Sequence, residues 1–317
     1  MLATSANSAL IVPTLNAGPQ WREWIEAVGR QSLRPGRILV IDSSSTDDTV
    51  RLAHDAGFEL LAIPRAEFGH GRTRQLGVER TAPAEFLIFM TQDAILARDD
   101  AFEELLRGFS APKVAAAYGR QLPHPGAGAI ASHARAFNYP AEAAVRSMAD
   151  APRLGIKTSF LSNSFAAWRR TALEAVGGFD PETLVNEDAL AASRLLLDGW
   201  EIAYRPSAEV FHSHDYTPIQ DFKRYFDIGI FHRQNPWIRE RFGKAEGEGG
   251  RFVRSEMAYL ANRAPWLVPS ALLRTGLKWA GYRLGVGHQS LPPGLARRMS
   301  QYPGQWRNTR TTPEEIK

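Results

Sequence analysis

Four segments of the chain place carboxylate, hydroxyl and imidazole groups at spacings that suit chemistry on a phosphorylated ligand. Asp42 opens a run of serine, threonine and aspartate residues, Asp93 follows a short apolar segment, and Asp188 ends an Asn-Glu-Asp triplet. His212 and His214 alternate in a segment of extended pattern, so both imidazoles would point to one side. Carboxylates and imidazoles in such settings can hold a cation, and a carboxylate can also accept a proton.

Each of these segments also has a purely structural interpretation. Residues 42–49 can be a strand end followed by a helix over 46–56 with Ser45 as its N-cap. In the other interpretation, Asp42 accepts a hydrogen bond from the N3–H of a pyrimidine, and loop hydroxyls such as Ser44 contact sugar or phosphate. Asp93 alone could cap a turn, and the two histidines could be core residues.

Asp188 is expected in the first turn of a helix, where acids are common because the helix dipole favours negative charge. The same dipole would keep Asp188 ionised, which a general base requires. A structural cap and a catalytic base therefore both remain open at this position.

Alternating apolar runs and helical patterns predict the elements that must position these groups. Strands separated by helices of this length predict right-handed crossovers and a mostly parallel α/β sheet with helices on both faces. Ligands bind at the carboxyl ends of the strands in such sheets, where Thr14, Asn16, Asp42 and Asp93 fall. The expected strands are 9–12, 37–41, 58–63, 86–90, 114–118, 164–168, 201–204 and 209–212, and the expected helices are 21–31, 46–56, 72–80, 99–109, 169–176 and 187–198.

The composition excludes several classes of protein. The chain has 317 residues, of which 44% are hydrophobic and 23% charged, enough for a sizeable core. It has no cysteine, which excludes disulfides, thiolate metal sites and a cysteine nucleophile. Neither a secretory signal nor an apolar stretch of about 20 residues is visible, so we expect a cytoplasmic protein.

Charge is distributed unevenly along the chain. Residues 1–215 hold 21 basic and 26 acidic residues, a net −5, whereas residues 216–317 hold 17 and 8, a net +9. We therefore expect an α/β domain over 1–215 and a helical, basic extension over 216–317. Within the extension, 244–250 is expected to be a flexible link, 258–284 helical with breaks near Pro265 and Pro269, and the last 25 or so residues a poorly ordered tail.

The helix after Leu273 is expected to be amphipathic and basic. An apolar face would carry Leu273, Leu277, Ala280 and Leu284, and an adjoining face Arg274, Lys278 and Tyr282. Such a helix could lie on an anionic membrane, here the inner face of the plasma membrane. The alternative is packing on the α/β domain or on another subunit of a homo-oligomer. We expect no nucleic-acid partner.

Five motifs, in order, resemble those of family 2 glycosyltransferases, over about residues 8–235. Asp42 to Thr49 is similar to the signature Asp-x-x-Ser-Thr-Asp-x-Thr, and Val12 to Asn16 to the strand and turn that precede it. Gly71 to Gly77 resembles a Gly-x-x-Arg-Asn-x-Gly helix start, with Gln75 in place of asparagine. The two others are Thr91-Gln92-Asp93, where the family has Asp-x-Asp, and Gly177-Gly178-Phe179-Asp180 followed by Glu187-Asp188.

The resemblance implies a GT-A fold, an inverting mechanism and roles for particular residues. Asp188 would be the catalytic base. Asp93 would hold Mg²⁺ or Mn²⁺, with His214 favoured over His212 as a second ligand, although Thr91 replaces the first aspartate of the family. The implied donor-binding residues are Thr14, Asn16, Asp42, Ser44, Arg74, Gln92 and Asp93.

Within the family, the Phe-Gly-His-Gly-Arg loop and the Thr-Gln-Asp-Ala segment are most similar to bacterial rhamnosyltransferases of surface-polysaccharide assembly. This implies dTDP-L-rhamnose, or another pyrimidine nucleotide-sugar, as donor. The implied acceptor is a saccharide or a polyprenyl-diphosphate-linked saccharide. Two competing classes are a metal-dependent phosphohydrolase or nucleotidyltransferase and a noncatalytic polysaccharide-binding protein.

Overall fold

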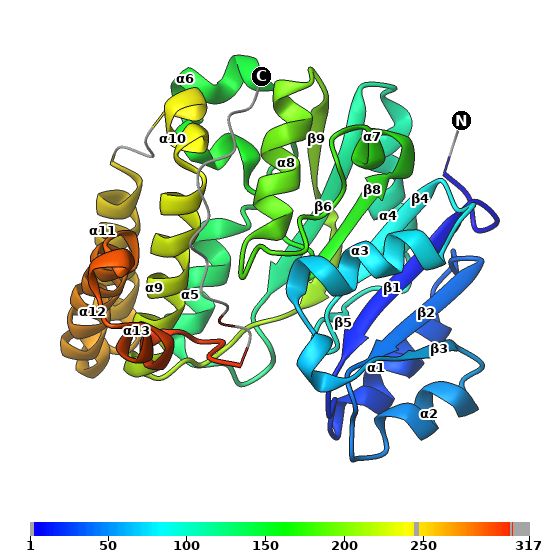
Figure 1. Cartoon of the computed structure of the whole chain (residues 1–317), viewed down its shortest axis with the longest axis horizontal. Helices are drawn as coiled ribbons and strands as arrows, with labels where there is room; N and C mark the ends of the chain where they lie inside the picture. The colour runs from blue at the N-terminus through cyan, green and yellow to red at the C-terminus, as the bar shows by residue number, and fades with distance from the viewer. Residues whose placement is uncertain (1–2, 244–246, 305, 307–317) are drawn as a thin grey trace.

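A curled, mostly parallel sheet forms the centre of the molecule (Figure 1). The computed structural model describes residues 3–243, 247–304 and 306, and in this part of the chain the sheet has nine strands in the order β3-β2-β1-β4-β8-β6-β9-β5, with β7 paired to β9. The first four strands in this order are parallel, and β8 runs antiparallel between β4 and β6. The predicted α/β class is thus confirmed.

The strands differ in length and burial along the sheet. Those at the centre, β1, β4 and β8, are almost wholly buried, because helices cover both faces. The strands are β1 (Ser8–Thr14), β2 (Arg37–Asp42), β3 (Glu59–Ala62), β4 (Phe86–Met90), β5 (Ile95–Leu96), β6 (Val114–Leu122), β7 (Ala144–Arg146), β8 (Phe165–Arg169) and β9 (Glu201–Phe211).

The helices fall into two groups, those that flank the sheet and those that follow it. The first group comprises α1 (Gln20–Gly29), α2 (Thr49–Asp55), α3 (His70–Arg80), α4 (Ala101–Leu106), α5 (Ala129–Asn138), α6 (Ala151–Leu154), α7 (Arg170–Ala175) and α8 (Glu187–Leu197). The second comprises α9 (Pro218–Gln234), α10 (Pro236–Phe242), α11 (Glu248–Arg263), α12 (Val268–Val286) and α13 (Pro293–Met299).

Two apolar layers form the core, one on each face of the sheet. On one face, alternate strand residues pack against α1, α2 and α4, with Trp21 and Trp24 of α1 fully buried. On the other face, the intervening strand residues pack against α3, α7 and α8. This alternation is what the two-residue period of a strand covered on both faces requires.

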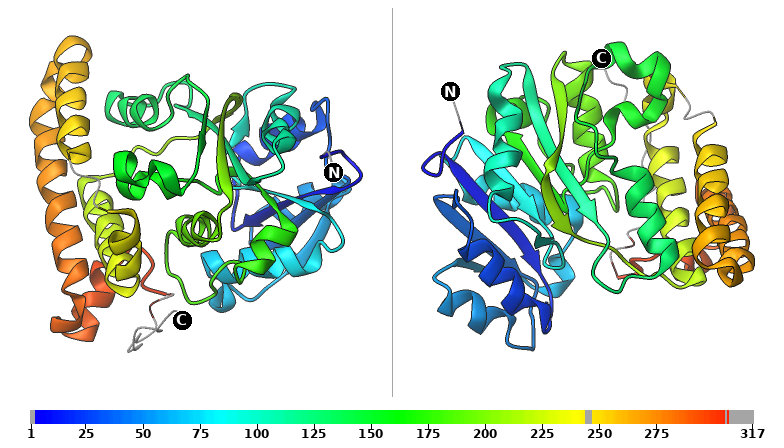
Figure 2. Two further views of the ribbon diagram at one scale, coloured as in Figure 1. Left: turned by 90° about the horizontal axis from the view of Figure 1, so that it is seen from above. Right: turned by 180° about the vertical axis from the view of Figure 1, so that it is seen from behind.

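Helices α9, α11 and α12 lie side by side as a separate layer beyond the sheet (Figures 1 and 2). Helix α9 meets α12 at close backbone approach, because a Cβ added at Gly281 or Gly285 would lie 2.3 and 2.0 Å from the carbonyl oxygens of Phe222 and Phe226. Helix α11 packs against α5, so the layer also contacts the sheet domain. No helix in the described part of the chain is long and apolar enough to span a membrane.

Several sequence expectations are corrected by the structure. Helix α2 begins at Thr49 rather than at 46, because Ser45 turns back to hydrogen-bond Asp42 instead of capping the helix. The two short strands over 201–212 are one strand, β9, whose bulge against β6 accommodates the stretch around Pro206. Helix α5 and strands β5 and β7 were not expected.

The C-terminal region is more ordered than its composition suggests. Of the expected flexible link, 248–250 begin α11, while 244–246 lie outside the described residues. The break near Pro265 is confirmed, but Pro269 lies in the first turn of α12, where proline is compatible with a helix. The expected tail includes α13; residues 305 and 307–317 are not described.

Candidate active site

The carboxyl ends of β1 and β2 are joined by a hydrogen-bond network centred on Asp42. Thr14 and Asp42 are directly opposite each other in the parallel pair, and the Thr14 hydroxyl donates to the Asp42 carboxylate over 3.0 Å. Ser45 donates to the same carboxylate from its backbone N–H at 2.8 Å and from its hydroxyl at 2.5 Å. Asp42 therefore shapes the loop itself, and its contact with a nucleotide base stays a prediction.

Three non-glycine residues have positive φ angles, two of them in the loops at this edge of the sheet and one at the start of α8. They are Asn16 (φ 46°), Ser44 (φ 68°) and Asn186 (φ 62°), and the described chain has no others. Asn16 accepts a hydrogen bond from the Thr46 backbone at 2.7 Å, and the Ser44 hydroxyl donates to the Ile63 carbonyl at 3.0 Å. Left-handed backbone at non-glycine residues concentrates at functional sites, so its position here supports a binding role for these loops.

Gln92 holds the end of β4 against the loop after β1. Its side-chain oxygen accepts from the Leu15 N–H at 2.7 Å, and its amide nitrogen donates to the Leu15 carbonyl at 3.1 Å. The predicted donor contact of Gln92 is untested, and its structural role is to position the neighbouring Asp93. Thr91 and Asp93 lie on either side of it at the same strand end.

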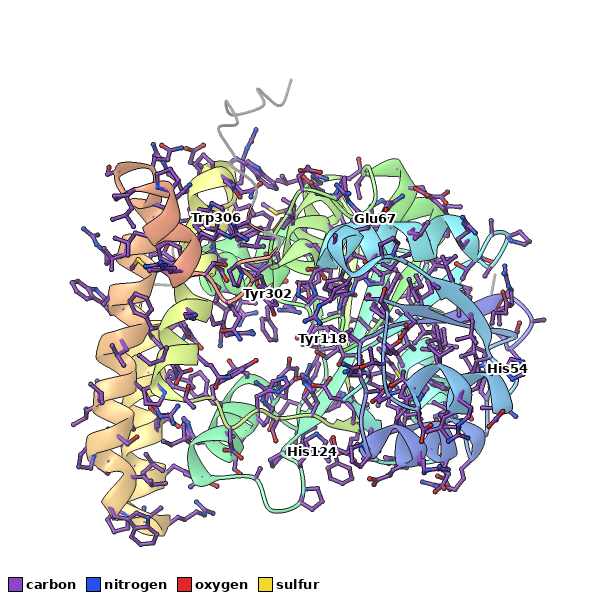
Figure 3. All side chains as sticks on the ribbon, turned by 60° about the horizontal axis from the view of Figure 1, so that its bottom comes forward. His54, Glu67, Tyr118, His124, Tyr302 and Trp306 are labelled. Carbon is purple, nitrogen blue, oxygen red and sulfur yellow. The ribbon has the colours of Figure 1, made fainter. Side chains whose placement is uncertain are left out.

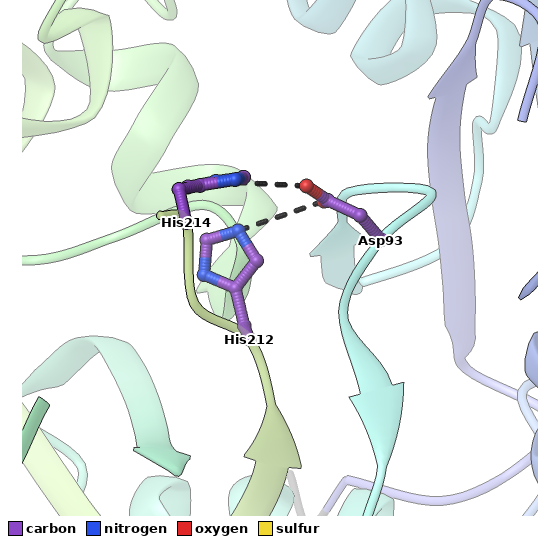
Figure 4. Close-up of side chains that lie close together, drawn as sticks. All are labelled: Asp93, His212 and His214. Atoms are coloured by element: carbon purple, nitrogen blue, oxygen red, sulfur yellow. Dashed lines mark ion pairs between the residues drawn. The ribbon is translucent and has the colours of Figure 1, made fainter. Parts of the chain in front are cut away.

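Asp93 faces both histidines of the His-x-His pair (Figure 4). Its carboxylate oxygens lie 3.5 Å from His212 Nε2 and 3.6 Å from His214 Nε2, and the three ligand atoms are within 4.8 Å of one another. The two imidazoles thus point the same way, as the alternating pattern indicates. Because His212 is as close to Asp93 as His214 is, the set that can hold a metal has three members.

The second nitrogen of His212 fixes the orientation of its ring. His212 Nδ1 lies 2.9 Å from Gln121 Oε1, which also accepts from Arg135. Since arginine can only donate, the Gln121 oxygen faces both groups and His212 carries its proton on Nδ1. The Nε2 lone pair then faces the Asp93 carboxylate with no proton between them, which fits a cation at this position.

The electrostatics of the cluster agree with a metal-binding role. Burial alone would raise the pKa of Asp93, but this pKa lies below its ordinary range, so the carboxylate is ionised at neutral pH. Burial lowers the pKa of His212, and burial together with His212 lowers that of His214 to about 4. At neutral pH the cluster is therefore one carboxylate and two neutral imidazoles, the protonation state in which these groups bind metals.

Asp188 lies in the first turn of α8. It is linked through a short chain of contacts to the cluster of Asp93, His212 and His214, called here the metal-type cluster. Its carboxylate accepts from the backbone N–H of Asn163 at 3.0 Å and of Ala189 at 2.8 Å. The adjacent Ser162 hydroxyl accepts from Gln121 at 3.1 Å, and Gln121 contacts His212. The path from Asp188 to Asp93 thus runs through residues 162 and 163, just before β8.

The pKa of Asp188 is raised to about 7, first by burial and then by the neighbouring Glu187 carboxylate. This differs from the expectation that the helix dipole dominates. The two backbone hydrogen bonds do lower the pKa, but burial and the like charge outweigh them. A carboxylate with a pKa near 7 is a stronger base than an ordinary aspartate while being substantially ionised at neutral pH.

Arg74, predicted to contact phosphate, forms a buried ion pair with Glu187. Its Nη1 lies 2.8 Å from a Glu187 carboxylate oxygen, and both side chains are at most 6% exposed. The ion pair joins α3 to the start of α8, and the hydrogen bond from the Phe179 N–H to Gln75 joins α3 to the loop that precedes α8. Arg74 thus positions the turn that carries Asp188; its Nε remains buried without a partner, and its predicted phosphate contact is untested.

Trp168 belongs to the core. It is fully buried, packs edge-to-face on Phe179, and donates from Nε1 to Asn163 at 2.8 Å. The residues near the cluster that the sequence left unassigned are Gln121, which contacts His212, and Ser162, which contacts Gln121. Gln121 was missed because the strand was expected to end at Tyr118, whereas β6 continues to Leu122.

The fold and the site together define a class of protein. The hydroxyl-rich edge of the parallel sheet and the Asp/His/His cluster can hold a nucleotide-diphosphate. The carboxylate of raised pKa at the start of α8 can remove a proton from an incoming hydroxyl. That combination is typical of nucleotide-sugar-dependent glycosyltransferases of the GT-A fold.

The chain belongs to glycosyl transferase family 2, whose model matches residues 9–177. The chain is 48% identical over 310 residues to the O-antigen chain rhamnosyltransferase WbaN of Salmonella anatum, with 97% of this chain and 98% of that protein covered. It is 47% identical to the O-antigen chain rhamnosyltransferase RfbN of Salmonella typhimurium strain LT2, with 97% and 99% covered.

Solved structures share the fold at low sequence identity. A Pyrobaculum calidifontis mannosyltransferase in complex with GDP-mannose and Mn²⁺ is 18% identical, with a TM-score of 0.55 over 96% of this chain and 87% of that chain. The S. aureus TarS fragment 1–349 is 16% identical, with a TM-score of 0.53 over 90% and 92%. These likenesses confirm the predicted GT-A fold.

Proposed function

We propose that the protein transfers L-rhamnose from dTDP-L-rhamnose to a hydroxyl of a saccharide, or of a polyprenyl-diphosphate-linked saccharide, during O-antigen assembly. The observation that carries this proposal is the 47–48% identity, over nearly the whole chain, to two O-antigen chain rhamnosyltransferases. The site supplies what such a transfer requires, namely a nucleotide-binding edge, a cation-binding cluster and a base.

The donor would bind across the carboxyl ends of β1, β2 and β4. Asp42 would accept from the N3–H of the thymine, because a carboxylate can accept about four hydrogen bonds and Thr14 and Ser45 supply three. Asn16 and Ser44 would contact the sugar or the phosphates from the strained loops. Arg74 and Gln92 would act chiefly through the parts of the site that they position.

Asp93, His212 and His214 would hold a divalent cation. The residues fit a metal because an imidazole lone pair and a carboxylate face each other without a shared proton. One oxygen ligand and two imidazoles suit Mn²⁺ better than Mg²⁺, which prefers oxygen alone. When bound, the cation would neutralise charge on the donor diphosphate.

The residues of the chain itself account for the proton and the geometry. Asp188 accepts the proton of the acceptor hydroxyl while the oxygen of that hydroxyl attacks the anomeric carbon. At the same time, the bond from the anomeric carbon to the diphosphate breaks. A single displacement of this kind inverts the anomeric configuration, and dTDP departs as the second product. Arg74 and Glu187 hold α8 so that Asp188 faces the acceptor.

The test is a transfer assay with dTDP-, UDP- and GDP-sugars, Mn²⁺ and a polyprenyl-diphosphate-linked saccharide. We expect a rhamnosylated product from dTDP-L-rhamnose that requires the acceptor. Donor consumption at the same rate without acceptor would instead favour the phosphohydrolase class. Transfer of a different sugar, with dTDP-L-rhamnose neither bound nor consumed, would overturn the donor assignment.

We further propose that residues 1–215 are the catalytic part and that 216–317 form an extension that docks on an anionic membrane surface. The basis for docking differs from the expected one. Arg274 and Lys278 do not line a free basic face, because their nitrogens lie 2.7 and 3.7 Å from the buried Asp221 of α9.

Helix α12 and the short turn that precedes it expose an apolar stripe with two tryptophans. Trp266, Leu272, Leu273 and Trp279 are 52–73% exposed, and residues 257–306 contain no acidic residue. Exposed tryptophan with leucine, next to the exposed Arg283, is typical of a helix that lies in a membrane interface.

Liposome flotation tests this proposal. The double variant Trp266→Ser/Trp279→Ser should lose most binding to anionic vesicles, whereas Val145→Ser, an exposed apolar residue on β7, should bind like the wild type. Unchanged flotation of the double variant would reject the membrane role. A concentration-dependent dimer that the same variant abolishes would assign the stripe to self-association.

A further inference from the structure

Arg224 of α9 lies close to the metal-type cluster, although it comes from the C-terminal helical layer. Its guanidinium carbon is 5.8 Å from the centre of the Tyr216 ring, and that ring lies 5.0 Å from the ring of His214. His214 in turn contacts Asp93. The side chain of Arg224 is exposed, and Figure 3 shows Tyr302 between the C-terminal helices and the sheet domain.

A second arginine approaches the same cluster from α5. Arg135 donates from Nη1 to Gln121, stacks its guanidinium 5.5 Å from the centre of the Tyr139 ring, and has a buried Nε with no partner. Arg224 donates no hydrogen bond to any residue in the described part of the chain. Both arginines therefore have donors left for a ligand.

Neither arginine is neutralised by a carboxylate. Within the described residues, no acidic side chain lies within 4.0 Å of Arg135 or Arg224, whereas Arg274 and Lys278 nearby share Asp221. The neighbours of Arg224 are phenols, and burial raises the pKa of Tyr302 to about 12, so that this group is neutral at pH 7. Within the described residues, the positive charge at this point therefore has no direct ion-pair partner, although it acts at longer range on Asp227.

Both arginines lie near the cluster, Arg135 through Gln121 and His212, and Arg224 through Tyr216 and His214. A positive charge that has no ion-pair partner among the described residues has an anion as its natural complement.

We infer that Arg224, together with Arg135, binds the oxygens of a diphosphate group next to the Asp93 cluster, so that the C-terminal extension completes the active site. This inference rests on the proposed function, and it adds a ligand-binding side chain from outside the residues matched by the family model. The diphosphate belongs either to the nucleotide donor or to the polyprenyl-linked acceptor, because both carry the same chemistry.

The experiment compares Arg224→Gln with a control variant, Arg254→Gln. The control removes an exposed arginine of α11 that forms no part of the proposed site. Calorimetry measures the binding of dTDP with Mn²⁺ in one arm and of farnesyl diphosphate in the other. Loss of a charge-assisted hydrogen bond should weaken binding roughly 10- to 100-fold in Arg224→Gln, and Arg224→Lys should recover part of it. Circular dichroism confirms that each variant is folded.

The outcomes are distinct. Weaker dTDP binding by Arg224→Gln alone assigns the position to the donor diphosphate, and weaker farnesyl diphosphate binding assigns it to the acceptor. Affinities equal to those of Arg254→Gln in both arms overturn the inference while leaving the proposed function intact. If the wild-type protein binds no nucleotide-diphosphate at all, the proposed function fails, and the inference fails with it.

Discussion

Asp188 illustrates how one side chain acquires its chemistry from its surroundings. An aspartate at a helix start would ordinarily be strongly acidic, since the helix dipole and N–H donors favour the carboxylate. Here burial and the adjacent Glu187 raise its pKa to about 7, although two backbone N–H groups oppose the shift. Glu187 itself stays ionised, because Arg74 and His70 outweigh the effect of its burial on the pKa.

This pKa predicts the pH dependence of catalysis. Since only the ionised carboxylate accepts a proton, kcat/KM should fall about tenfold for each pH unit below about 7 and level off above it. Initial rates at subsaturating donor from pH 5.5 to 8.5 provide the measurement. A flat profile over that range would show that Asp188 does not titrate as the base.

The same shift has a consequence for stability with the opposite sign. Because the folded-state pKa is above the unfolded value, protonation of Asp188 stabilises the folded state fully at acid pH, and this contribution is lost as pH rises through about 7. The group thus favours activity and disfavours stability over the same pH range, as is common for functional carboxylates.

Gln121 is predicted to control metal affinity without touching the metal. Replacing it with methionine keeps its approximate size but removes the acceptor for His212 Nδ1. Loss of such an outer partner typically lowers metal affinity about 10- to 100-fold. Titration with Mn²⁺ should show this decrease for Gln121→Met, with the exposed His54→Gln as the control; equal affinities would remove Gln121 from the metal site.

At the scale of elements, the contact between α9 and α12 depends on glycines. A Cβ at Gly285 would lie 2.0 Å from the Phe226 carbonyl, whereas Gly276 in the same helix has nothing within 4 Å. The two helices therefore pack backbone against backbone. This contact fixes the position of α9, the helix that carries Arg224.

The pair Gly285→Ala and Gly276→Ala tests this contact within one helix. Gly285→Ala should destabilise the protein by about 1–3 kcal/mol through overpacking. Gly276→Ala should be neutral or stabilise by about 0.5–1 kcal/mol through helix propensity. Urea unfolding gives both values. If Gly285→Ala has the same free energy of unfolding as the wild type, the close packing of α9 against α12 does not contribute to stability.

The sequence predicts the elements that carry strong periodic patterns. Strands β1, β2 and β4 are recognisable because they are apolar runs between turn-forming residues, and β4 matches its expected bounds. Helix α5 is missed because its ten residues directly follow a Pro/Gly-rich loop and only two of them, Ala131 and His133, are buried. β7 is three residues long, too short for a pattern.

The site is predictable to the extent that motifs mark it. The Asp-Ser-rich loop, Asp93, Asp188 and the His-x-His pair stand out by residue type. The partners of these residues do not, because Gln121 and Asn163 are ordinary polar residues whose roles arise only when β6, β8 and α8 meet. The raised pKa of Asp188 is likewise a property of packing.

At the scale of the whole molecule, the two parts of the chain carry net charges of opposite sign. The α/β part is net acidic and carries the carboxylates of the site, whereas the C-terminal third is basic. In the fold the basic helices lie along one side of the sheet domain (Figure 2). Arg224 of α9 lies near the residues of the site, and the exposed tryptophan stripe lies on α12 and the turn before it. This arrangement would bring a lipid-linked acceptor to a catalytic centre near a membrane surface.

The central claim is that Asp188 takes the proton of the acceptor hydroxyl. The most direct test is turnover of Asp188→Asn, which keeps size but removes proton acceptance, with Asp198→Asn at the other end of α8 as the control. The account predicts a fall of about 10²–10⁴-fold in kcat for Asp188→Asn, with donor affinity little changed and the control near wild type. A folded Asp188→Asn enzyme with near-normal turnover would contradict the account, and Glu187 would then be the next candidate for the base.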